Sequence, residues 1–271
     1  MSKKQVKLFP PLRGVYVDLS KVPDPVFAEK MVGDGFAIDP LENVLYSPID
    51  GKIKSIHRAK HAITLESESG FDILIHIGLE TVSLGGKGFD VKVKEGQLVK
   101  VGDKLTEFDM DYIAGNVVAL ITPVLVTDME EKQISIDILP HGVVTDLNQA
   151  IMLVTLGGEK AAQLADTSVA PVVASLESEL ITIPNTHGIH ARPAAQLNAI
   201  ARKYPNNEIL MLKGEQSANV KSVVSLLSLS VQYQDQIKIL VKGDNATAII
   251  DEIKNSLIAM HDDANETPTP A

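Results

Sequence analysis

The residues best suited to chemistry in this chain are a histidine and an arginine in the segment 187–193. Pro193 suits the first turn of a helix, because its missing N–H would be unpaired there in any case. His190 should therefore lie at a helix N-terminus, where free N–H groups and the helix dipole favour an anion. Arg192 adds a planar fork of donors that fits phosphate oxygens. These residues could hold a phosphoryl group on His190; a capping histidine beside a surface arginine explains them equally well.

A second pair of histidines is expected on two neighbouring strands, at residues 61–67 and 71–78. A turn centred between Glu68 and Ser69 would place His61 directly opposite His76. Opposed side chains have Cβ atoms about 4.5–5.5 Å apart, so two imidazoles could flank one phosphoryl group. One packing histidine and one surface histidine are the alternative. A third interpretation makes them zinc ligands, but a closed zinc site needs four ligands and no nearby Cys/His cluster supplies the others.

The elements that must position these histidines form two domains. Residues 1–155 have short alternating strands broken by Gly, Asp and Asn, with no amphipathic run of helical length before residue 110. This pattern predicts an all-β sandwich or barrel. Residues 156–178 are rich in Ala, Ser and acidic residues and predict a flexible linker. Residues 261–271 are acidic, end in alternating Thr-Pro and predict the start of another linker.

Residues 179–260 alternate strand and helix patterns. Aliphatic runs at 208–213 and 236–241 predict strands, with a weaker one at 217–221. Residues 222–231 and 246–259 carry apolar side chains on one helical face, and Asp244 is expected to cap the second of these helices. Together with the helix after His190, this gives the order β-α-β-β-α-β-α and predicts an α+β domain.

The composition of the chain indicates its cellular compartment and the kinds of partner that it lacks. The 271 residues, 45% of them hydrophobic, are enough for two cores, and there is no cysteine for disulfide or thiolate chemistry. No apolar run reaches the ~18 residues of a membrane span, and the start lacks a signal peptide's apolar stretch, so we expect a cytoplasmic protein without membrane insertion. Residues 1–155 hold 16 basic and 22 acidic residues, whereas 181–260 hold 8 and 6. No feature suggests nucleic-acid binding.

Residues 179–260 resemble the histidine phosphocarrier protein (HPr) of the bacterial sugar phosphotransferase system (PTS). Its motif Gly-x-His-x-Arg-Pro is matched by Gly188, His190, Arg192 and Pro193. The resemblance implies an open-faced sandwich, in which helices cover one side of four antiparallel strands, and a phosphoryl group carried on His190. Ser222 falls where the family has a regulatory serine, although most serines at such positions only cap a helix. His187 stands where some relatives have asparagine, and a capping or ligand-shell role is expected for it.

The first domain resembles the glucose-type IIA component of the same system. The matching segments are residues 26–35, 47–51, 61–62, 76–78, 86–89, 95–96 and 101–103. The resemblance implies that His76 accepts the phosphoryl group and that His61 assists. Ala59 stands where the family often has a threonine bonded to the first histidine. His57 and Leu74 replace aromatic residues of an apolar docking ring, of which Phe27 remains.

The two resemblances together imply a relay. Phosphorylated enzyme I would load His190, His190 would load His76, and His76 would pass the group to a IIB domain of a sugar permease, commonly one for glucose or N-acetylglucosamine. No cofactor is expected. An alternative is a regulatory module that binds other proteins according to its phosphorylation state. In some bacteria enzyme I follows these two domains, and we interpret the chain as the front portion of such a fusion.

Overall fold

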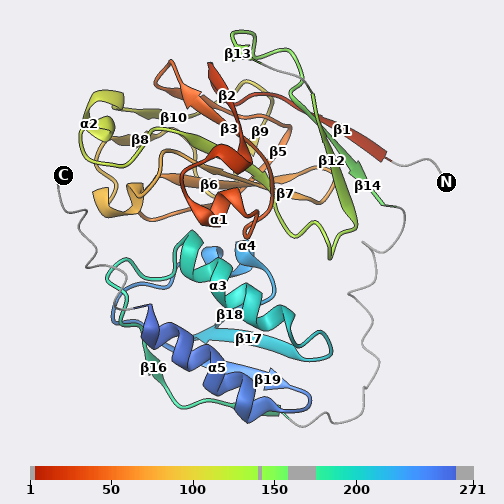
Figure 1. Ribbon diagram of the computed structural model, residues 1–271, viewed down its shortest axis with the longest axis vertical. Helices are drawn as coiled ribbons and strands as arrows, with labels where there is room; N and C mark the ends of the chain where they lie inside the picture. Colours follow the sequence, from red (N-terminus) through yellow and green to blue (C-terminus); the bar gives the residue numbers. More distant parts are fainter. Residues whose placement is uncertain (1–3, 140–141, 158–174, 261–271) are drawn as a thin grey trace. The chain divides into compact units, whose positions relative to one another are not determined.

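The computed structural model describes residues 4–139, 142–157 and 175–260. The chain forms two compact units, Met1–Asp166 and Thr167–Ala271 (Figure 1). Within the described residues, no helix is both long and apolar enough to cross a membrane.

The N-terminal unit is built from strands, as the alternating sequence pattern predicts. The strands are β1 (Lys4–Leu8), β2 (Gly14–Asp18), β3 (Asp34–Pro40), β4 (Val44–Tyr46), β5 (Gly51–Ile56), β6 (Ala62–Ser67), β7 (Asp72–His76), β8 (Phe89–Val91), β9 (Leu98–Val99), β10 (Lys104–Phe108), β11 (Thr122–Val126), β12 (Ile134–Ile138), β13 (Val143–Val144) and β14 (Met152–Leu156). The largest sheet has the order β13-β2-β3-β11-β7-β6-β5-β9, and two smaller sheets have the orders β1-β14-β12 and β4-β10-β8.

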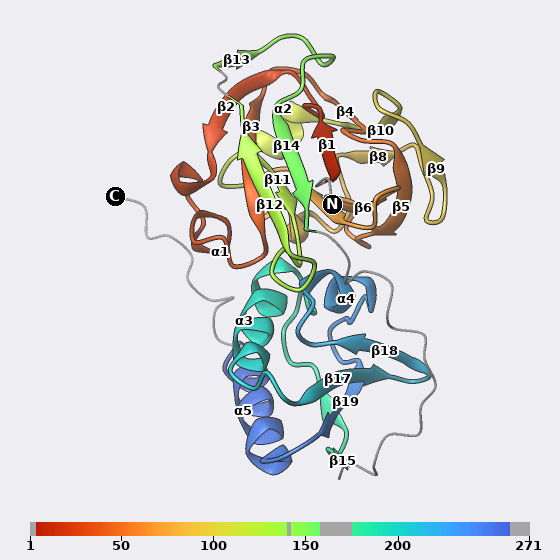
Figure 2. The same ribbon diagram turned by 90° about the vertical axis from the view of Figure 1, so that its right-hand side faces the viewer.

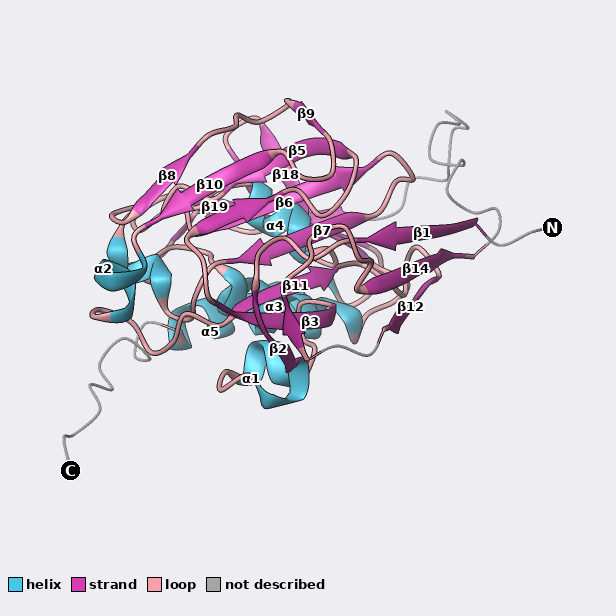
Figure 3. Cartoon of the chain, turned by 90° about the horizontal axis from the view of Figure 1, so that it is seen from above, coloured by secondary structure: helices cyan, strands magenta, loops and turns pink. Residues whose placement is uncertain are grey.

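The helices of this unit are short and lie at its periphery (Figure 3). They are α1 (Pro25–Ala28), α2 (Met110–Ala114) and the 3-10 turns η1 (Leu19–Lys21) and η2 (Thr81–Leu84). The Asp24 carboxylate caps α1 by accepting a hydrogen bond from the Val26 N–H at 2.9 Å, and Pro25 occupies the first helical position. Phe27 in this helix is buried, and its ring lies beside that of His76.

The hairpin of β6 and β7 lies inside the large sheet and is buried on both faces. Alternation sends Phe71, Ile73, Ile75 and Ile77 into the hydrophobic core. The opposite face of β7 carries Asp72, Leu74 and His76, which are also buried. Burial of these polar side chains requires partners, because an unpaired polar group in a dry environment is costly.

Asp72 is held by two lysines at the far end of this face from His76. Its Oδ2 pairs with Lys54 Nζ at 2.8 Å on β5 and with Lys132 Nζ at 3.0 Å in the loop before β12. Its backbone oxygen accepts the Thr127 N–H at 3.1 Å. These contacts join β7 to three other parts of the unit, so β7 is a firm support for the histidine at its end.

The expected register of this hairpin is wrong by one residue. His76 lies opposite Ala62, and the backbone carbonyl of His61 instead accepts the Ile77 N–H at 2.7 Å. The reason is the turn, which closes through a Ser67 N–H to Phe71 carbonyl bond and is therefore centred on Ser69.

The C-terminal unit is an α+β sandwich. Its strands are β15 (Ser175–Glu177), β16 (Ile181–Thr182), β17 (Glu208–Lys213), β18 (Gln216–Asn219) and β19 (Gln236–Lys242), and its helices are α3 (Ala191–Arg202), α4 (Val223–Ser228) and α5 (Ala246–Ala259). The sheet order is β15-β19-β17-β18, and β16 pairs with the first two residues of β19, whereas β15 pairs with the last three. Helices α3 and α5 lie together on one side of this sheet (Figure 2). The predicted α+β architecture is confirmed.

Two helix ends in this unit differ from the expectation. Helix α4 ends at Ser228 rather than at residue 231, because Ser230 adopts a left-handed backbone with φ of 49°. Helix α5 is preceded by Asn245 with φ of 58°, so Asp244 is not its cap. Asparagine tolerates the left-handed region better than most residues. The backbone oxygen of Asp244 instead accepts a hydrogen bond from the Asn207 amide at 2.7 Å.

Candidate functional site

The first candidate site centres on His76, the last residue of β7. Its side chain is 6% exposed, and its Nδ1 lies 2.8 Å from the Gly78 carbonyl oxygen. A carbonyl can only accept a hydrogen bond, so Nδ1 carries the proton and Nε2 keeps its lone pair. Burial lowers the pKa of His76, against the opposing effects of the Gly78 bond and of the Asp24 and Glu80 carboxylates. The ring is therefore neutral near pH 7, which leaves Nε2 nucleophilic.

The backbone conformation at residue 78 explains why glycine stands there. Its φ of +68° is left-handed, and the resulting turn directs its carbonyl back to the His76 ring. A Cβ on Gly78 would lie 2.8 Å from Thr81 Cγ2 and 3.1 Å from the Ala119 carbonyl oxygen. Glycine is thus required both for conformation and for space.

Four aromatic rings form a row through this site. The ring centroids are 5.3 Å apart for Phe27 and His76, 4.5 Å for His76 and His61, and 4.5 Å for His61 and His57. The structure therefore brings His61 and His76 together as expected, although they are not directly opposed across the strands. His61 precedes the first residue of β6, so the alternation of side chains along that strand does not fix the direction of its ring.

His57, which the family resemblance placed in the docking ring, lies next to His61. It opens the loop between β5 and β6, where its N–H donates to the Ala62 carbonyl at 2.9 Å and its carbonyl accepts the Lys60 N–H at 2.7 Å. Its Nδ1 accepts the Ala59 N–H at 3.1 Å. Burial, with a smaller contribution from His76, lowers the pKa of His57 to about 4. The family resemblance indicated that His57 lies near this site, but it did not indicate the ring contact with His61.

The second candidate site lies at the start of α3. His190 is the N-cap residue in extended conformation, and its carbonyl accepts the Ala194 N–H at 3.0 Å. Arg192 and Pro193 occupy the first turn, as predicted, and the side chains of His190 and Arg192 are both half-buried. The first N–H groups of a helix have no intrahelical partner, so an anion is favoured at this end.

The loop before His190 is fixed by its backbone. The Asn185 carboxamide oxygen accepts the His187 N–H at 2.9 Å, and the Asn185 carbonyl accepts the Gly188 N–H at 2.9 Å. Gly188 has φ of +66°, and a Cβ there would collide with the Val231 carbonyl oxygen. The Ile189 N–H donates to that same oxygen at 2.9 Å. This close approach accounts for the glycine of the motif.

Comparison with known proteins covers both units. Residues 6–132 match the family described as phosphoenolpyruvate-dependent sugar phosphotransferase system, EIIA 1. Residues 177–258 match the family described as PTS HPr component phosphorylation site. The glucose-specific EIIA component of Staphylococcus epidermidis is 45% identical over 130 residues, which make up 48% of this chain and 78% of that protein. This chain belongs to the glucose-type EIIA family and carries an HPr domain after it.

Other relatives agree with this assignment of the EIIA domain. The glucose-specific EIIA component of Staphylococcus aureus is 40% identical over 154 residues, covering 57% of this chain and 92% of that protein. The solved structure of the glucose permease IIA from Mycoplasma capricolum shares 37% identity and covers 55% of this chain and 96% of its own, with a TM-score of 0.52. The chain is thus a multidomain fusion of PTS phosphocarrier components that act in sugar transport.

Ser222 of the HPr domain is the N-cap of α4. Its Oγ accepts the Ser225 N–H at 3.2 Å, which is the ordinary capping role of serine. A regulatory role for Ser222 stays a prediction.

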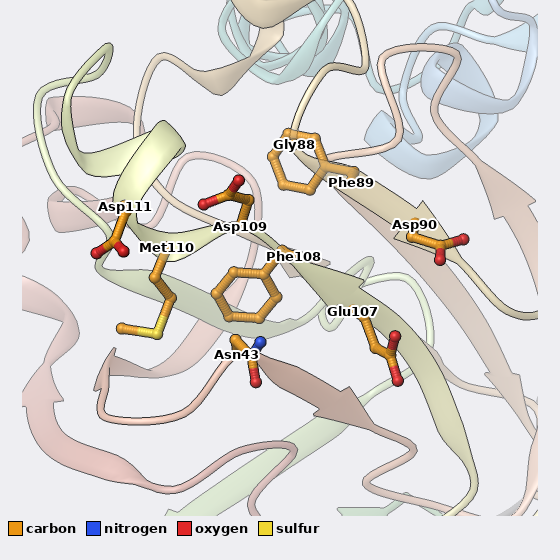
Figure 4. Close-up of a pocket in the computed structure, with 9 residues that line it drawn as sticks. All are labelled: Asn43, Gly88, Phe89, Asp90, Glu107, Phe108, Asp109, Met110 and Asp111. Atoms are coloured by element: carbon orange, nitrogen blue, oxygen red, sulfur yellow. The ribbon is translucent and has the colours of Figure 1, made fainter.

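A separate hollow of about 700 Å³ in the EIIA domain contains no histidine (Figure 4). Its acidic lining residues are Asp90, Glu107, Asp109 and Asp111. Lys92 pairs with two of them, Asp90 and Glu107, and the Asp109 carboxylate caps α2. Across the residues that the structure describes, no group of three or more His, Cys, Asp or Glu side chains could hold a metal ion. The described residues therefore supply no further ligands for a zinc ion at His61 and His76.

Proposed function

We propose that the chain is a phosphotransferase in which His190 receives a phosphoryl group from enzyme I and His76 receives it from His190. The observation that carries this proposal is the hydrogen bond from His76 Nδ1–H to the Gly78 carbonyl at 2.8 Å. It leaves the Nε2 lone pair as the nucleophile, beside a second imidazole whose centroid is 4.5 Å away.

We call His190 and His76, the two residues that carry the phosphoryl group, the first and second stations of the relay. At the first station the N-terminus of α3 and the Arg192 guanidinium hold the oxygens of the phosphoryl group. Both provide N–H donors and positive charge, which favour the anion carried by His190. The imidazole is a competent nucleophile when it is neutral near pH 7.

In the transfer step the His76 Nε2 lone pair forms a new N–P bond in line with the N–P bond that breaks. The bonding electron pair returns to the His190 ring. Such a transfer needs positioning and charge stabilisation more than covalent help from the protein. His61 donates a hydrogen bond to the phosphoryl oxygens at this second station and stabilises the group as it moves.

The relay needs a connection between the domains of His190 and His76, and it needs external partners. We assign residues 1–155 to the EIIA domain, 156–178 to a linker, 179–260 to the HPr domain and 261–271 to a further linker. The expected linker boundary is wrong at its end, because residues 175–177 form β15 and pair with β19 in the sheet of the HPr domain. Residues 158–174 and 261–271 lie outside the described residues. A linker of this length raises the effective concentration of one station near the other into roughly the millimolar range. The partners are enzyme I and a IIB domain of a glucose- or N-acetylglucosamine-type permease, and the compartment is the cytoplasm.

Labelling of variants tests the proposal. Purified chain is incubated with phosphoenolpyruvate and enzyme I, and acid-labile phosphate is located by mass spectrometry at alkaline pH. His190→Ala should remove phosphate from both stations, whereas His76→Gln should leave His190 labelled and the EIIA domain unlabelled. The exposed Thr186 is changed to Ala as a control that should still accept phosphate. Substantial labelling of His76 in the His190→Ala chain would overturn the proposal.

A further inference from the structure

His187 lies beside His190 at a distance that differs from the other histidine pair. The ring centroids of His187 and His190 are 6.4 Å apart, with 76° between the ring planes. The rings of His61 and His76 are in contact, at 4.5 Å. The wider spacing leaves room for an oxygen atom between the imidazoles, since an N–H···O hydrogen bond spans about 2.7–3.2 Å.

The backbone holds His187 firmly even though its side chain is exposed. Asn185 fixes it from both sides, by accepting the His187 N–H on its side-chain oxygen and the Gly188 N–H on its carbonyl. The Asn185 amide in turn donates to the Met260 carbonyl at 3.4 Å, at the end of α5. The described part of the chain offers no hydrogen-bond partner to the His187 ring. Neither packing nor internal bonding therefore explains this imidazole.

We propose that His187 is a further donor to the phosphoryl group on His190, beside the α3 N-terminus and Arg192, so that each station of the relay uses a pair of imidazoles. This inference rests on the proposed function and deepens it. A neutral imidazole has one N–H donor and a protonated one has two. With the α3 N-terminus and Arg192 on other oxygens, a donor from His187 completes the set of partners for a dianion with three oxygens.

The expected consequence is thermodynamic. A hydrogen bond made only to the phosphorylated form stabilises that form and shifts the loading equilibrium, whereas a surface role in docking changes only the rate. Enzyme I is a catalyst, so it cannot alter the final ratio of phosphorylated to free His190 at a fixed ratio of phosphoenolpyruvate to pyruvate. The equilibrium therefore distinguishes a phosphoryl donor from a docking residue.

The test uses the full chain with His76→Gln, in which phosphate stops at His190. The labelled fraction is measured at equilibrium over a series of phosphoenolpyruvate to pyruvate ratios. His187→Phe keeps a ring without a donor, His187→Asn keeps a donor, and Thr186→Ala is the control at the exposed neighbour. We expect His187→Phe to lower the loading equilibrium constant about threefold or more, as for a charged hydrogen bond at a partly exposed site. His187→Asn and the control should stay within about twofold of the parent chain.

Three results would overturn the inference. An unchanged equilibrium in His187→Phe, with His190 labelled, refutes it and leaves the relay intact. A slower approach to the same end point assigns His187 to docking and refutes it as well. Failure of the His76→Gln chain itself to label at His190 refutes the proposed function, and the inference with it.

Discussion

The lowered pKa of His57 predicts a pH dependence of stability that one substitution should remove. Burial holds the His57 pKa at about 4, against 6.5 for an unperturbed histidine. Between these values the ring is neutral in the folded chain and protonated in the unfolded chain. The unfolded chain then binds more protons, so the stability rises with pH across this window. Stability should therefore be lost as the pH falls from 6.5 towards 4.

The size of the effect follows from the same two values. Each pKa unit is worth about 1.4 kcal/mol, so the full difference corresponds to about 3 kcal/mol. The His57 side chain is half-buried rather than fully enclosed, which reduces the expected contribution to about 2 kcal/mol. His57→Phe retains an aromatic ring beside His61 and cannot be protonated, so its stability should decline about 2 kcal/mol less than that of the parent over this window.

Urea unfolding at several pH values between 7.5 and 4 measures this difference. Methyl NMR signals of Ile63 and Ile75, which are buried in the core of the EIIA domain, report on this domain alone. The contribution of His76, whose pKa is also lowered by burial, remains in both proteins. The control is His187→Phe, a change at an exposed ring in the HPr domain. Equal slopes for the parent and His57→Phe between pH 6.5 and 4 would refute the reasoning.

Three further substitutions test single contacts. Arg192→Lys keeps the charge but loses the planar fork of donors. The rate of phosphoryl transfer from enzyme I, measured by stopped flow, should therefore fall, while the circular dichroism spectrum stays unchanged. An equal rate would exclude Arg192 from the chemistry. His61→Gln should still allow labelling of His76 but should reduce onward transfer to a IIB domain, and an unaltered onward rate would remove His61 from the assisting role. Gly78→Ala should cost at least about 1–2 kcal/mol in urea unfolding from backbone conformation alone, and should slow His76 labelling; wild-type values for both would show that the turn is not required.

The helix and strand pattern of the HPr domain could be predicted because its signals are local. Pro193 and the apolar face after it mark α3, and the strand at 208–213 matches β17 to the residue. The cap of α5 could not be predicted, because Asn245 adopts a left-handed conformation that depends on its surroundings. Sequence alone favoured Asp244, which is the commoner kind of cap.

In the EIIA domain the pairing of His61 with His76 was predicted, but the geometry behind it was not. A one-residue change in the hairpin turn moves His61 out of direct opposition, and its position ahead of β6 restores the contact. The tautomer of His76 depends on the carbonyl of Gly78, a backbone group that residue types do not reveal. The row that ends at His57 is likewise a product of tertiary packing.

Transfer between two separately blocked chains tests the relay most directly. The His76→Gln chain is phosphorylated at His190, freed of enzyme I and phosphoenolpyruvate, and mixed with the unlabelled His190→Ala chain. The account predicts that phosphate leaves His190 of the first chain and appears on His76 of the second, as located by peptide mapping at alkaline pH. Phosphate that stays on the donor, or that appears on His61 of the acceptor, would contradict it.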